Sequence, residues 1–445
     1  MNSLKIGIRG VVGETFTPEL AVAFAQAFGT YLDAGRILVC RDTRTSGPMV
    51  HASVVAGLLA TGCEVFDLGV CPTPSLQLAV GWLGAEGGIS ITAGHNPEPW
   101  NALKFVRSDG LYLNATQADE LLDIYHQAEF DKADWKRIRA GVVRRDAIPH
   151  HLETLAQAFD VEAVRARRLT VAVDCCNSSC ALLSPRWLRA LGCEVLALND
   201  DPASPFPHAP EPTRQTMAQL RAVVAAGRAA VGFAHDADGE RLGLVTEKGE
   251  VLSEELTLAV AAEIQLRRKV GPVVTNVSTS MLVERVAARH GAEVIRTPVG
   301  QAFVSEAMVE AGAVIGGEGS GGVVVPRVQW THDAAAAAGL ILEHLATTGE
   351  TVSGLADSLP RLAMLKHNVA VEPDRIHALL GRLHDGLERE GVPYDQTDGV
   401  RVLQPDGWVH ARVSNTESML RLIAEAETEA RARELLDWAR DRIGK

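Results

Sequence analysis

The sequence predicts an α/β protein built from three similar α/β domains and a smaller C-terminal α+β domain. Short apolar runs with strand character alternate with longer segments of helical spacing, which is typical of right-handed βαβ units and mixed, mostly parallel sheets. This order recurs three times and changes near residue 366. A chain of 445 residues is also too long for one ordinary core. The expected domains are residues 1–145, 146–252, 253–364 and 365–445.

The first domain is expected to begin with a strand at 5–13 and a helix that starts at Pro18 with Thr17 as its cap. Further strands are predicted at 37–40, 64–68 and 87–91, and further helices at 50–61 and from Pro72 onward. The strand at 87–91 runs into a small polar loop at 92–97 that an Asn-Pro turn closes. A loop at a strand end is where α/β proteins place chemistry.

The later domains follow from the same signals. The second has predicted strands at 169–174, 194–198 and 229–234, and helices at 217–226 and at 185–191 with Ser184 as cap. The third has predicted helices at 256–266, 281–289 and 302–311, and strands at 272–276, 293–297 and 314–315. The fourth has predicted strands at 368–371, 399–403, 408–412 and 420–426, helices at 374–390 and 429–443, and a hairpin turn at Asp406-Gly407.

Composition narrows the class of protein. Hydrophobic residues make up 47% and charged residues 22% of the chain, as in soluble globular proteins. The formal net charge of -13 argues against nucleic acid and anionic membrane as partners, since both need basic surface. The sequence has no apolar run of membrane-spanning length, and its N-terminus lacks a signal-peptide profile. These features predict a cytoplasmic protein.

The seven cysteines are scattered, mostly in apolar runs. Cys175, Cys176 and Cys180 lie close together in the sequence, but no second Cys pair or spaced His completes a zinc pattern. Buried free thiols in a reducing cytoplasm are therefore expected, in preference to metal ligands or disulfides.

An acidic loop (residues 236–240) follows the predicted strand at 229–234. Asp236, Asp238 and Glu240 alternate with small residues that let the loop curl, so the three carboxylates can converge on one cation. Mg²⁺ prefers such oxygen ligands. The alternative is a solvated acidic turn.

Two further loops carry polar groups that suit a phosphorylated ligand. The glycine-rich loop at 316–322 holds Glu318 and Ser320, which can bond sugar hydroxyls while the glycines allow close backbone approach. The loop that begins at Arg412 offers a guanidinium, hydroxyls and an amide as a phosphate cradle. The residues of this cradle are Arg412, Ser414, Asn415 and Thr416, and Arg421 either adds charge or faces solvent.

Taken in order, the loops at 92–97, 236–241, 316–322 and 412–417 resemble the four active-site loops of the α-D-phosphohexomutases. The resemblance covers the whole chain. It implies three related α/β domains and a smaller fourth around a central cleft. The implied activity is movement of a phosphoryl group between the 1- and 6-positions of a hexose or hexosamine phosphate. The Gly-Glu-Gly-polar-Gly-Gly version of the glycine-rich loop resembles that of the phosphoglucosamine and phosphomannose mutases.

The resemblance also implies roles for single residues. Arg9 would hold the transferring phosphoryl group, His95 and Lys104 would orient groups and handle protons, and Asp42 and Arg44 would support them. It implies Mg²⁺ on the acidic loop, a sugar 1,6-bisphosphate as activator, and a sugar phosphate as the small-molecule partner of a monomer or homodimer. Substrate contacts are implied for Arg241, Glu318, Ser320 and His332, and phosphate contacts for Arg412, Ser414, Asn415, Thr416 and Arg421.

Several residues depart from the family pattern. Gly94 stands where the family has the serine that carries the phosphoryl group, and Glu240, His332 and Ser418 replace an Asp, an Arg and a Pro. Three explanations remain open: an inactivating change in an ordinary mutase, a diverged paralogue that binds sugar phosphates without turnover, or an active enzyme with another phosphoryl acceptor, such as His95 or a bound bisphosphate. Because the other loop residues match, residue 94 is expected to point at the acidic loop.

Overall fold

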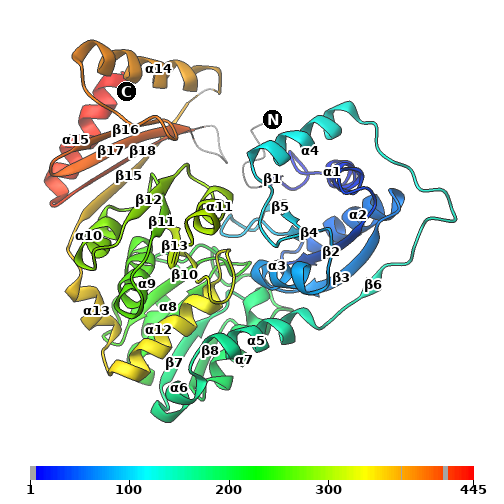
Figure 1. Ribbon diagram of the computed structural model, residues 1–445, viewed down its shortest axis with the longest axis horizontal. Helices are drawn as coiled ribbons and strands as arrows, with labels where there is room; N and C mark the ends of the chain where they lie inside the picture. The colour runs from blue at the N-terminus through cyan, green and yellow to red at the C-terminus, as the bar shows by residue number, and fades with distance from the viewer. Residues whose placement is uncertain (1–6, 372, 414–418, 445) are drawn as a thin grey trace.

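The computed structural model describes residues 7–371, 373–413 and 419–444, and within these ranges the strands form four sheets. Figure 1 shows the first domain on the right, the second and third in green and yellow, and the fourth at the upper left. Three sheets are mixed with mostly parallel pairing, and the fourth is wholly antiparallel. The expected fold class is confirmed.

The first sheet has the order β1-β5-β4-β2-β3-β6. Its strands are β1 (Ile8–Val11), β2 (Arg36–Arg41), β3 (Glu64–Val70), β4 (Gly87–Ile91), β5 (Trp100–Arg107) and β6 (Val142–Val143). Its helices are α1 (Pro18–Tyr31), α2 (Gly47–Ala60), α3 (Thr73–Trp82) and α4 (Ala115–Gln127). Thr17 caps α1 as expected, accepting from Leu20 N at 3.3 Å. Alternate residues of β2 enter different cores, Ile37 with α1 and α2 and Leu38 with α3, so helices cover both faces.

The second and third domains share one large hydrophobic core. The second sheet (β10-β9-β7-β8) consists of β7 (Thr170–Asp174), β8 (Glu194–Leu198), β9 (Val231–His235) and β10 (Leu242–Thr246). Its helices are α5 (Ala147–Ala158), α6 (Val161–Arg167), the 3-10 helix η1 (Ser179–Leu182), α7 (Ser184–Ala190) and α8 (Ala218–Gly227).

The third sheet (β12-β11-β13-β14) consists of β11 (Val273–Asn276), β12 (Val294–Thr297), β13 (Ile315–Glu318) and β14 (Gly322–Val324). Its helices are α9 (Glu254–Arg268), α10 (Leu282–Arg289), α11 (Gln301–Ala311), α12 (Ala334–Thr348) and α13 (Val352–Ser358). Strands β9 and β13 deliver the acidic loop and the glycine-rich loop, as expected from the sequence.

The fourth sheet has the order β15-β18-β17-β16. Its elements are β15 (Ala363–Ala370), α14 (Pro373–Glu390), β16 (Val400–Gln404), β17 (Gly407–Val413), β18 (Met419–Ala426) and α15 (Glu429–Ile443). Gln404 faces Gly407 across the β16–β17 hairpin, which confirms the turn predicted there. No helix in the described part of the chain is both long and apolar enough to cross a membrane.

The strand predicted at 368–371 begins earlier, since β15 starts at Ala363, and two further local features differ from what the sequence led us to expect. Ser184 does not cap α7: the cap position is Leu183, because η1 runs almost directly into α7 and places Ser184 in its first turn. Helix α12 was not predicted, because its first half is a run of alanines without a polar face. Such a helix is buried all round, and the periodicity that marks an amphipathic helix is then absent.

Candidate active site

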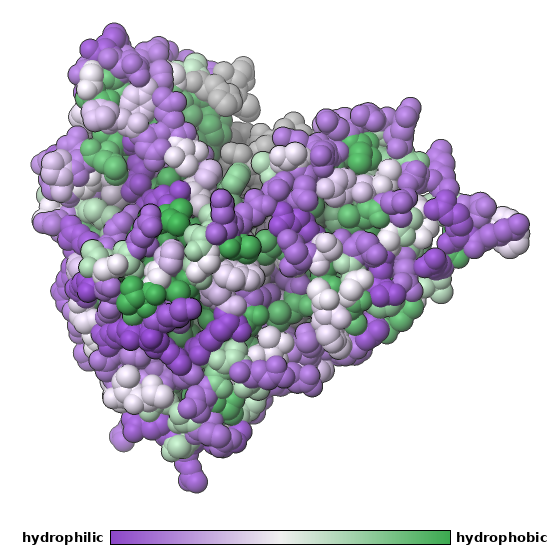
Figure 2. All heavy atoms as spheres, in the orientation of Figure 1, coloured by the Kyte–Doolittle hydropathy of each residue, from purple (hydrophilic) through white to green (hydrophobic). Residues whose placement is uncertain are grey.

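A cleft of about 620 Å³ lies where the four domains meet. Residues from each domain line it, among them Arg9, Asp236, Glu318 and Arg412. Its volume falls in the roughly 300–1,000 Å³ range of small-ligand sites. Figure 2 shows that the outline of the molecule is indented between the fourth domain and the first. The cleft can therefore take a molecule the size of a sugar bisphosphate.

The loop at 92–97 is fixed from beneath by one guanidinium. Arg44, whose side chain is fully buried, donates to the carbonyl oxygens of Gly94 and Asn96, each at 2.7 Å, and further to those of Pro97 and Trp100. Its Nε donates to Asp42 Oδ2 at 2.9 Å, and Thr92 Oγ1 donates to the same oxygen at 2.7 Å. This set of bonds holds the loop in one shape.

Gly94 lies in the left-handed region, at φ +54°. A Cβ built on Gly94 would lie 3.2 Å from Asp238 Oδ2. A side chain at residue 94 would therefore point at the acidic loop.

The acidic loop is bonded to the first domain through Lys104 on β5. Lys104 Nζ donates to Asp238 Oδ2 at 2.7 Å and to Glu240 Oε2 at 2.8 Å. Tyr112 Oη donates to Glu240 Oε1, so both oxygens of that carboxylate are engaged. Asp236 Oδ1 accepts from the backbone N–H groups of Glu240 and Arg241, each at 3.1 Å.

Burial and neighbouring charges set the protonation of these groups. Burial, and next the charge of Asp238, raise the pKa of Asp236 well above its ordinary value. Burial also acts to raise the pKa of Asp238, but Lys104 outweighs it and the pKa of Asp238 lies below its ordinary value. For Lys104, burial is outweighed by Asp238 and Glu240, and its pKa is raised. Lys104 is therefore a firmly protonated ammonium ion whose charge is balanced by Asp238 and Glu240.

The fit of the acidic loop to a metal ion is partial. Asp236 and Asp238 are buried carboxylates, and Asp238 Oδ1 has no hydrogen-bond partner, so this pair suits a hard cation. Glu240 is instead bonded to Lys104 and Tyr112. Among the described residues no three His, Cys, Asp or Glu side chains are gathered to hold an ion. One ion shared by all three carboxylates stays a prediction.

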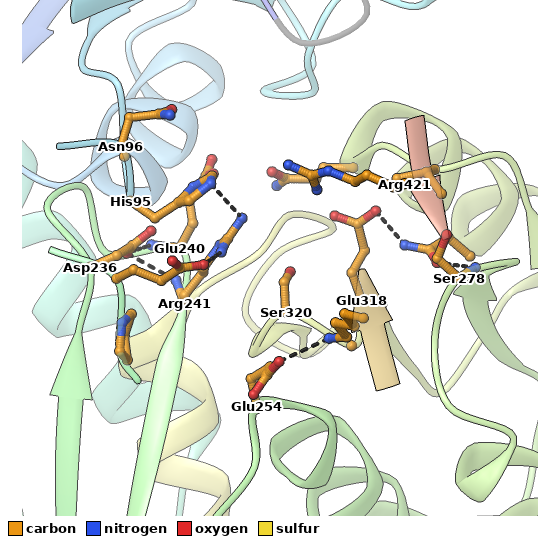
Figure 3. A pocket seen from close by; sticks show the side chains of 18 of the residues that line it. His95, Asn96, Asp236, Glu240, Arg241, Glu254, Ser278, Glu318, Ser320 and Arg421 are labelled. Atoms are coloured by element: carbon orange, nitrogen blue, oxygen red, sulfur yellow. Dashed lines mark hydrogen bonds and ion pairs between the residues drawn. The ribbon is translucent and has the colours of Figure 1, made fainter. Parts of the chain in front are cut away.

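His95 and Asn96 lie beside Asp236 and Glu240 on one side of the cleft, and Arg241 reaches toward His95 (Figure 3). Arg9 Nη1 donates to Asn96 Oδ1 at 3.2 Å, and Arg241 Nη2 lies 3.5 Å from His95 Nε2. Burial, and next Arg241, lower the pKa of both Arg9 and His95, that of His95 to well below its ordinary value. His95 is thus a neutral imidazole whose Nε2 can accept. Such mutually repelling cations favour binding of an anion between them.

The glycine-rich loop forms another wall of the cleft. Glu318 Oε1 accepts from Asn276 Nδ2 at 2.6 Å and from Gly300 N at 3.0 Å, while Ser320 also lines the cleft. His332 is buried, and its Nε2 has no partner. Burial lowers the pKa of His332, so this ring is also neutral.

The predicted phosphate cradle is placed in part. Arg412 is buried at the cleft, and its Nε donates to Asp398 Oδ2 at 3.3 Å. Arg421 lines the cleft and points toward its centre (Figure 3). The other predicted members, Ser414, Asn415 and Thr416, lie outside the described residues, as does Ser418. The two arginines come from neighbouring strands, β17 and β18, where they face each other across the sheet.

Sequence reasoning missed several residues of the site. Tyr112 Oη donates to Glu240. With the Gln301 amide turned so that both of its ends are paired, its Nε2 donates to Glu240 Oε1 at 3.2 Å and its Oε1 accepts from His332 N at 2.8 Å. Lys366 lines the cleft and bonds Glu255 Oε1 at 2.8 Å. These residues stand outside any motif. The one signal for Lys366 was its place at the change of pattern between the third domain and the fourth.

Comparison with known families agrees with this architecture. Four domain profiles of the phosphoglucomutase/phosphomannomutase family match in order. They are alpha/beta/alpha domain I at residues 5–132, domain II at 149–249, domain III at 253–362 and the C-terminal domain at 366–441. Together they cover most of the chain.

Relatives match nearly the whole of this chain. A phosphoglucomutase/phosphomannomutase of Thermococcus kodakarensis is 37% identical over 97% of this chain and 96% of its own. A probable phosphoglucosamine mutase of Methanopyrus kandleri is 38% identical over 97% of this chain and 95% of its own. The crystal structure of a phosphoglucomutase/phosphomannomutase family protein from Burkholderia thailandensis superposes with a TM-score of 0.85 at 28% identity, covering 100% of this chain and 98% of that one. With four matching domains and full-length relatives, this chain belongs to the phosphoglucomutase/phosphomannomutase family of phosphohexomutases.

Proposed function

We propose that the protein binds a hexose or hexosamine phosphate and moves its phosphoryl group between the 1- and 6-positions, with phosphoglucosamine as the favoured substrate class. The single observation that carries this proposal is the direction of residue 94: a Cβ there would lie 3.2 Å from Asp238 Oδ2, so the loop still presents this position to the acidic loop. Relatives named as probable phosphoglucosamine mutases, at 38% and 33% identity, support the sugar class.

Each group in the cleft has a part in this proposal. Arg412 and Arg421 would bind the phosphate that does not react, and Glu318 and Ser320 would bond the sugar hydroxyls. Arg9, with its lowered pKa but still a cation, would stabilise charge on the transferring phosphoryl oxygens. The charged Lys104 would stabilise negative charge that develops on the reacting oxygens, and the neutral His95 would accept the proton of the attacking hydroxyl and return it to the leaving oxygen. Arg241 and His332 complete the proposed substrate contacts.

Mg²⁺ belongs to the proposal as the cofactor. Asp236 and Asp238 would hold it, with Glu240 as a third ligand only if its bonds to Lys104 and Tyr112 are given up. When bound, Mg²⁺ would neutralise charge on the phosphoryl oxygens. A cytoplasmic location is part of the proposal too, since all seven cysteines are free thiols, the form kept in reducing compartments.

Because Gly94 has no side-chain oxygen, the phosphoryl group needs another carrier. A bound sugar 1,6-bisphosphate or His95 could serve. The same glycine supports a second candidate function, a catalytically silent protein that binds or senses sugar phosphates.

One experiment separates the two. Phosphorus NMR with glucose, mannose and glucosamine phosphates and Mg²⁺ should show isomerisation, increased by glucose 1,6-bisphosphate. Saturable binding by calorimetry without any product, with and without bisphosphate, would establish the silent binding protein instead. Absence of both turnover and binding would contradict both functions.

A further inference from the structure

Two neighbouring carbonyls of the acidic loop are held by helix ends from two different domains. Thr73 N, at the start of α3 in the first domain, donates to Asp238 O at 2.9 Å. Ala334 N, at the start of α12 in the third domain, donates to Gly239 O at 3.1 Å. A Cβ on Gly239 would lie 3.1 Å from Pro72, so the loop passes directly against the start of α3. The position of the acidic loop therefore depends on the separation of these two helix ends.

A buried chain of hydrogen bonds also connects the start of α3 to the start of α12. Ser75 Oγ lies 2.8 Å from His151 Nδ1, and His151 Nε2 lies 2.9 Å from Asp333 Oδ2. All three side chains are 0% exposed. Ser75 belongs to α3, His151 to α5 and Asp333 caps α12, so the chain joins the three α/β domains. Gln329 makes a second connection between the same two helices, since its Nε2 donates to Pro74 O at 3.3 Å and to Asp333 Oδ2 at 2.7 Å.

The chain of bonds is fully satisfied at both ends. Asp333 Oδ1 accepts from Ala335 N and Ala336 N, each at 3.0 Å, as a helix cap does. With Asp333 as an acceptor, His151 Nε2 is the donor, and in a neutral ring Nδ1 then accepts from the hydroxyl of Ser75. A buried network whose members are all paired is rigid, whereas loss of one member leaves the others unpaired at a cost.

The start of α3 is also bonded to the strand that delivers residue 94. Thr73 Oγ1 lies 2.8 Å from Ser90 Oγ, on β4. The helix end that holds the acidic loop through its N–H thus contacts, through its side chain, the strand leading to Gly94. Displacing α3 would move the two loops relative to each other.

Ser75, His151 and Asp333 have the order of groups found in a hydrolytic triad. Because none of them is exposed, no substrate can reach Ser75, and a nucleophilic role is excluded in this state. We propose instead that His151 is a positioning residue: by fixing the separation of α3 and α12, it holds the acidic loop in place beneath residue 94. Its relevance to catalysis rests on the proposed function, but the positioning itself does not.

The test compares two histidines of the same helix. His151→Phe keeps an aromatic ring but removes both hydrogen bonds. His150→Phe is the matched control, because His150 stacks on Trp82 at the far end of α3, with ring centroids 4.2 Å apart, and a phenyl ring keeps that stacking. Hydrogen exchange followed by mass spectrometry should show at least about tenfold faster exchange in peptides containing Thr73, residues 236–241 and Ala334 for His151→Phe, and parent-like exchange for His150→Phe.

Calorimetry with Mg²⁺ alone gives a second readout. Loss of an outer support of a metal site costs roughly 10–100-fold in affinity, and His151→Phe should lose at least about tenfold while His150→Phe binds as the parent does. If the parent itself does not bind Mg²⁺, the metal assignment fails, and the exchange experiment still decides the role of His151.

Two milder variants cover the case that His151→Phe does not fold. His151→Gln places an amide donor near Asp333 and loses the bond to Ser75, and Ser75→Ala removes the same bond from the other side. Both should give faster exchange confined to the acidic loop and the two helix ends. Parent-like exchange in these segments, together with a lowered melting temperature, would show a purely structural histidine and overturn the proposal.

Discussion

The ammonium group of Lys104 lies 2.7 Å from Asp238 Oδ2, an ion pair between the first and second domains with the Lys104 side chain 8% and the Asp238 side chain 1% exposed. Glu240 is the second carboxylate on the same ammonium, at 2.8 Å. Breaking a buried pair leaves an uncompensated charge, which is more costly than the pair is worth. Lys104 therefore does two things: it holds the acidic loop against β5, and it balances charge that a bound cation would also balance.

Replacing Lys104 by Met should lower the free energy of unfolding by about 3–5 kcal/mol, because Asp238 and Glu240 lose their buried partner. Excess Mg²⁺ should restore part of this loss, since a divalent ion can supply the missing charge, and should stabilise the variant more than the parent. Denaturant unfolding with and without Mg²⁺ measures both effects. Lys248→Met is the control: Lys248 is an exposed partner of Asp357, so its loss should cost less than about 1 kcal/mol. Equal costs for the two variants would contradict the charge-balancing role.

The raised pKa of Asp236 predicts a pH-dependent gain in stability for Asp236→Asn. Its folded-state pKa lies well above the ordinary 3.8, chiefly because of burial. Between the unfolded and the folded pKa, and above both, ionisation favours the unfolded chain, so the carboxylate costs the folded state stability at pH 7. Below the unfolded pKa both states are protonated and the cost disappears. Asn keeps the oxygen that accepts from Glu240 N and Arg241 N.

Denaturant unfolding in the absence of Mg²⁺ should therefore show Asp236→Asn to be more stable than the parent at pH 7, with a difference that shrinks as the pH falls toward 4. Asp200→Asn is the control, because the side chain is exposed and its substitution should change the free energy of unfolding at pH 7 by less than about 0.5 kcal/mol. A stability difference that does not change with pH would mean that burial of the ionised Asp236 carboxylate does not destabilise the folded state. The same variant should bind Mg²⁺ more weakly. The Asp236 carboxylate would then lower the stability of the fold while being required for metal binding.

Arg412 provides a prediction about the phosphate. Its buried guanidinium is paired with the carboxylate of Asp398 and lines the cleft, so a phosphate would gain a charge-assisted bond there. Arg412→Ala should weaken binding of hexose 6-phosphates by at least ~1.5 kcal/mol, about tenfold, in calorimetry. Arg401→Ala, on the neighbouring strand with its guanidinium over Trp408, is a control that should leave the affinity unchanged. Parent-like affinity of Arg412→Ala would remove Arg412 from the site.

A feature of the site could be predicted from the sequence when its residues are contiguous in the chain. The loops at 92–97 and 236–240 were found because their polar residues stand together after an apolar strand, and the structure places both at the cleft. Tyr112 and Gln301 could not be found this way, because each is a single residue brought to Glu240 by the fold. The chain of Ser75, His151 and Asp333 is the extreme case: three ordinary residues from three domains, joined only by tertiary packing.

Helices and strands could likewise be predicted where their sequence carries a local signal. Elements with a clear period, such as the last three strands of the fourth domain, were predicted to within a residue at each end, whereas β15 begins five residues before the strand predicted at 368–371. The alanine-rich start of α12 has no period to detect, because the helix packs on all sides within the core shared by the second and third domains. The engagement of Glu240 with Lys104 and Tyr112 also escaped the sequence, because alternating carboxylates indicate a shared cation whether or not a lysine lies between them.

Gly94→Ser tests whether the cleft can carry out phosphoryl transfer once residue 94 has a side-chain oxygen. The residue sits at φ +54°, where a non-glycine residue costs about 1–2 kcal/mol, so the variant should be slightly less stable than the parent. The loop should nevertheless keep its shape, because Arg44 bonds the carbonyls on either side of the turn rather than the side chain at 94. The new side chain would start 3.2 Å from Asp238 Oδ2 and place a hydroxyl beside the acidic loop. Incubation with glucose 1,6-bisphosphate and Mg²⁺ should then add one phosphate to the protein by intact mass, and mutase turnover should rise by several powers of ten.

Gly94→Ala is the matched control, because it carries the same backbone strain and a Cβ but no oxygen. It should match Gly94→Ser in stability and take up no phosphate. If Gly94→Ser also takes up no phosphate and gains no activity, while the parent binds sugar phosphates, the protein is a sugar-phosphate-binding protein. A missing serine hydroxyl at residue 94 is then not the sole reason that it lacks mutase activity. If the parent already turns over as fast as Gly94→Ser, residue 94 is not the carrier. His95, the neutral imidazole next along the loop, is then the group to examine, since phosphate on a ring nitrogen is released in acid and phosphate on a serine is not.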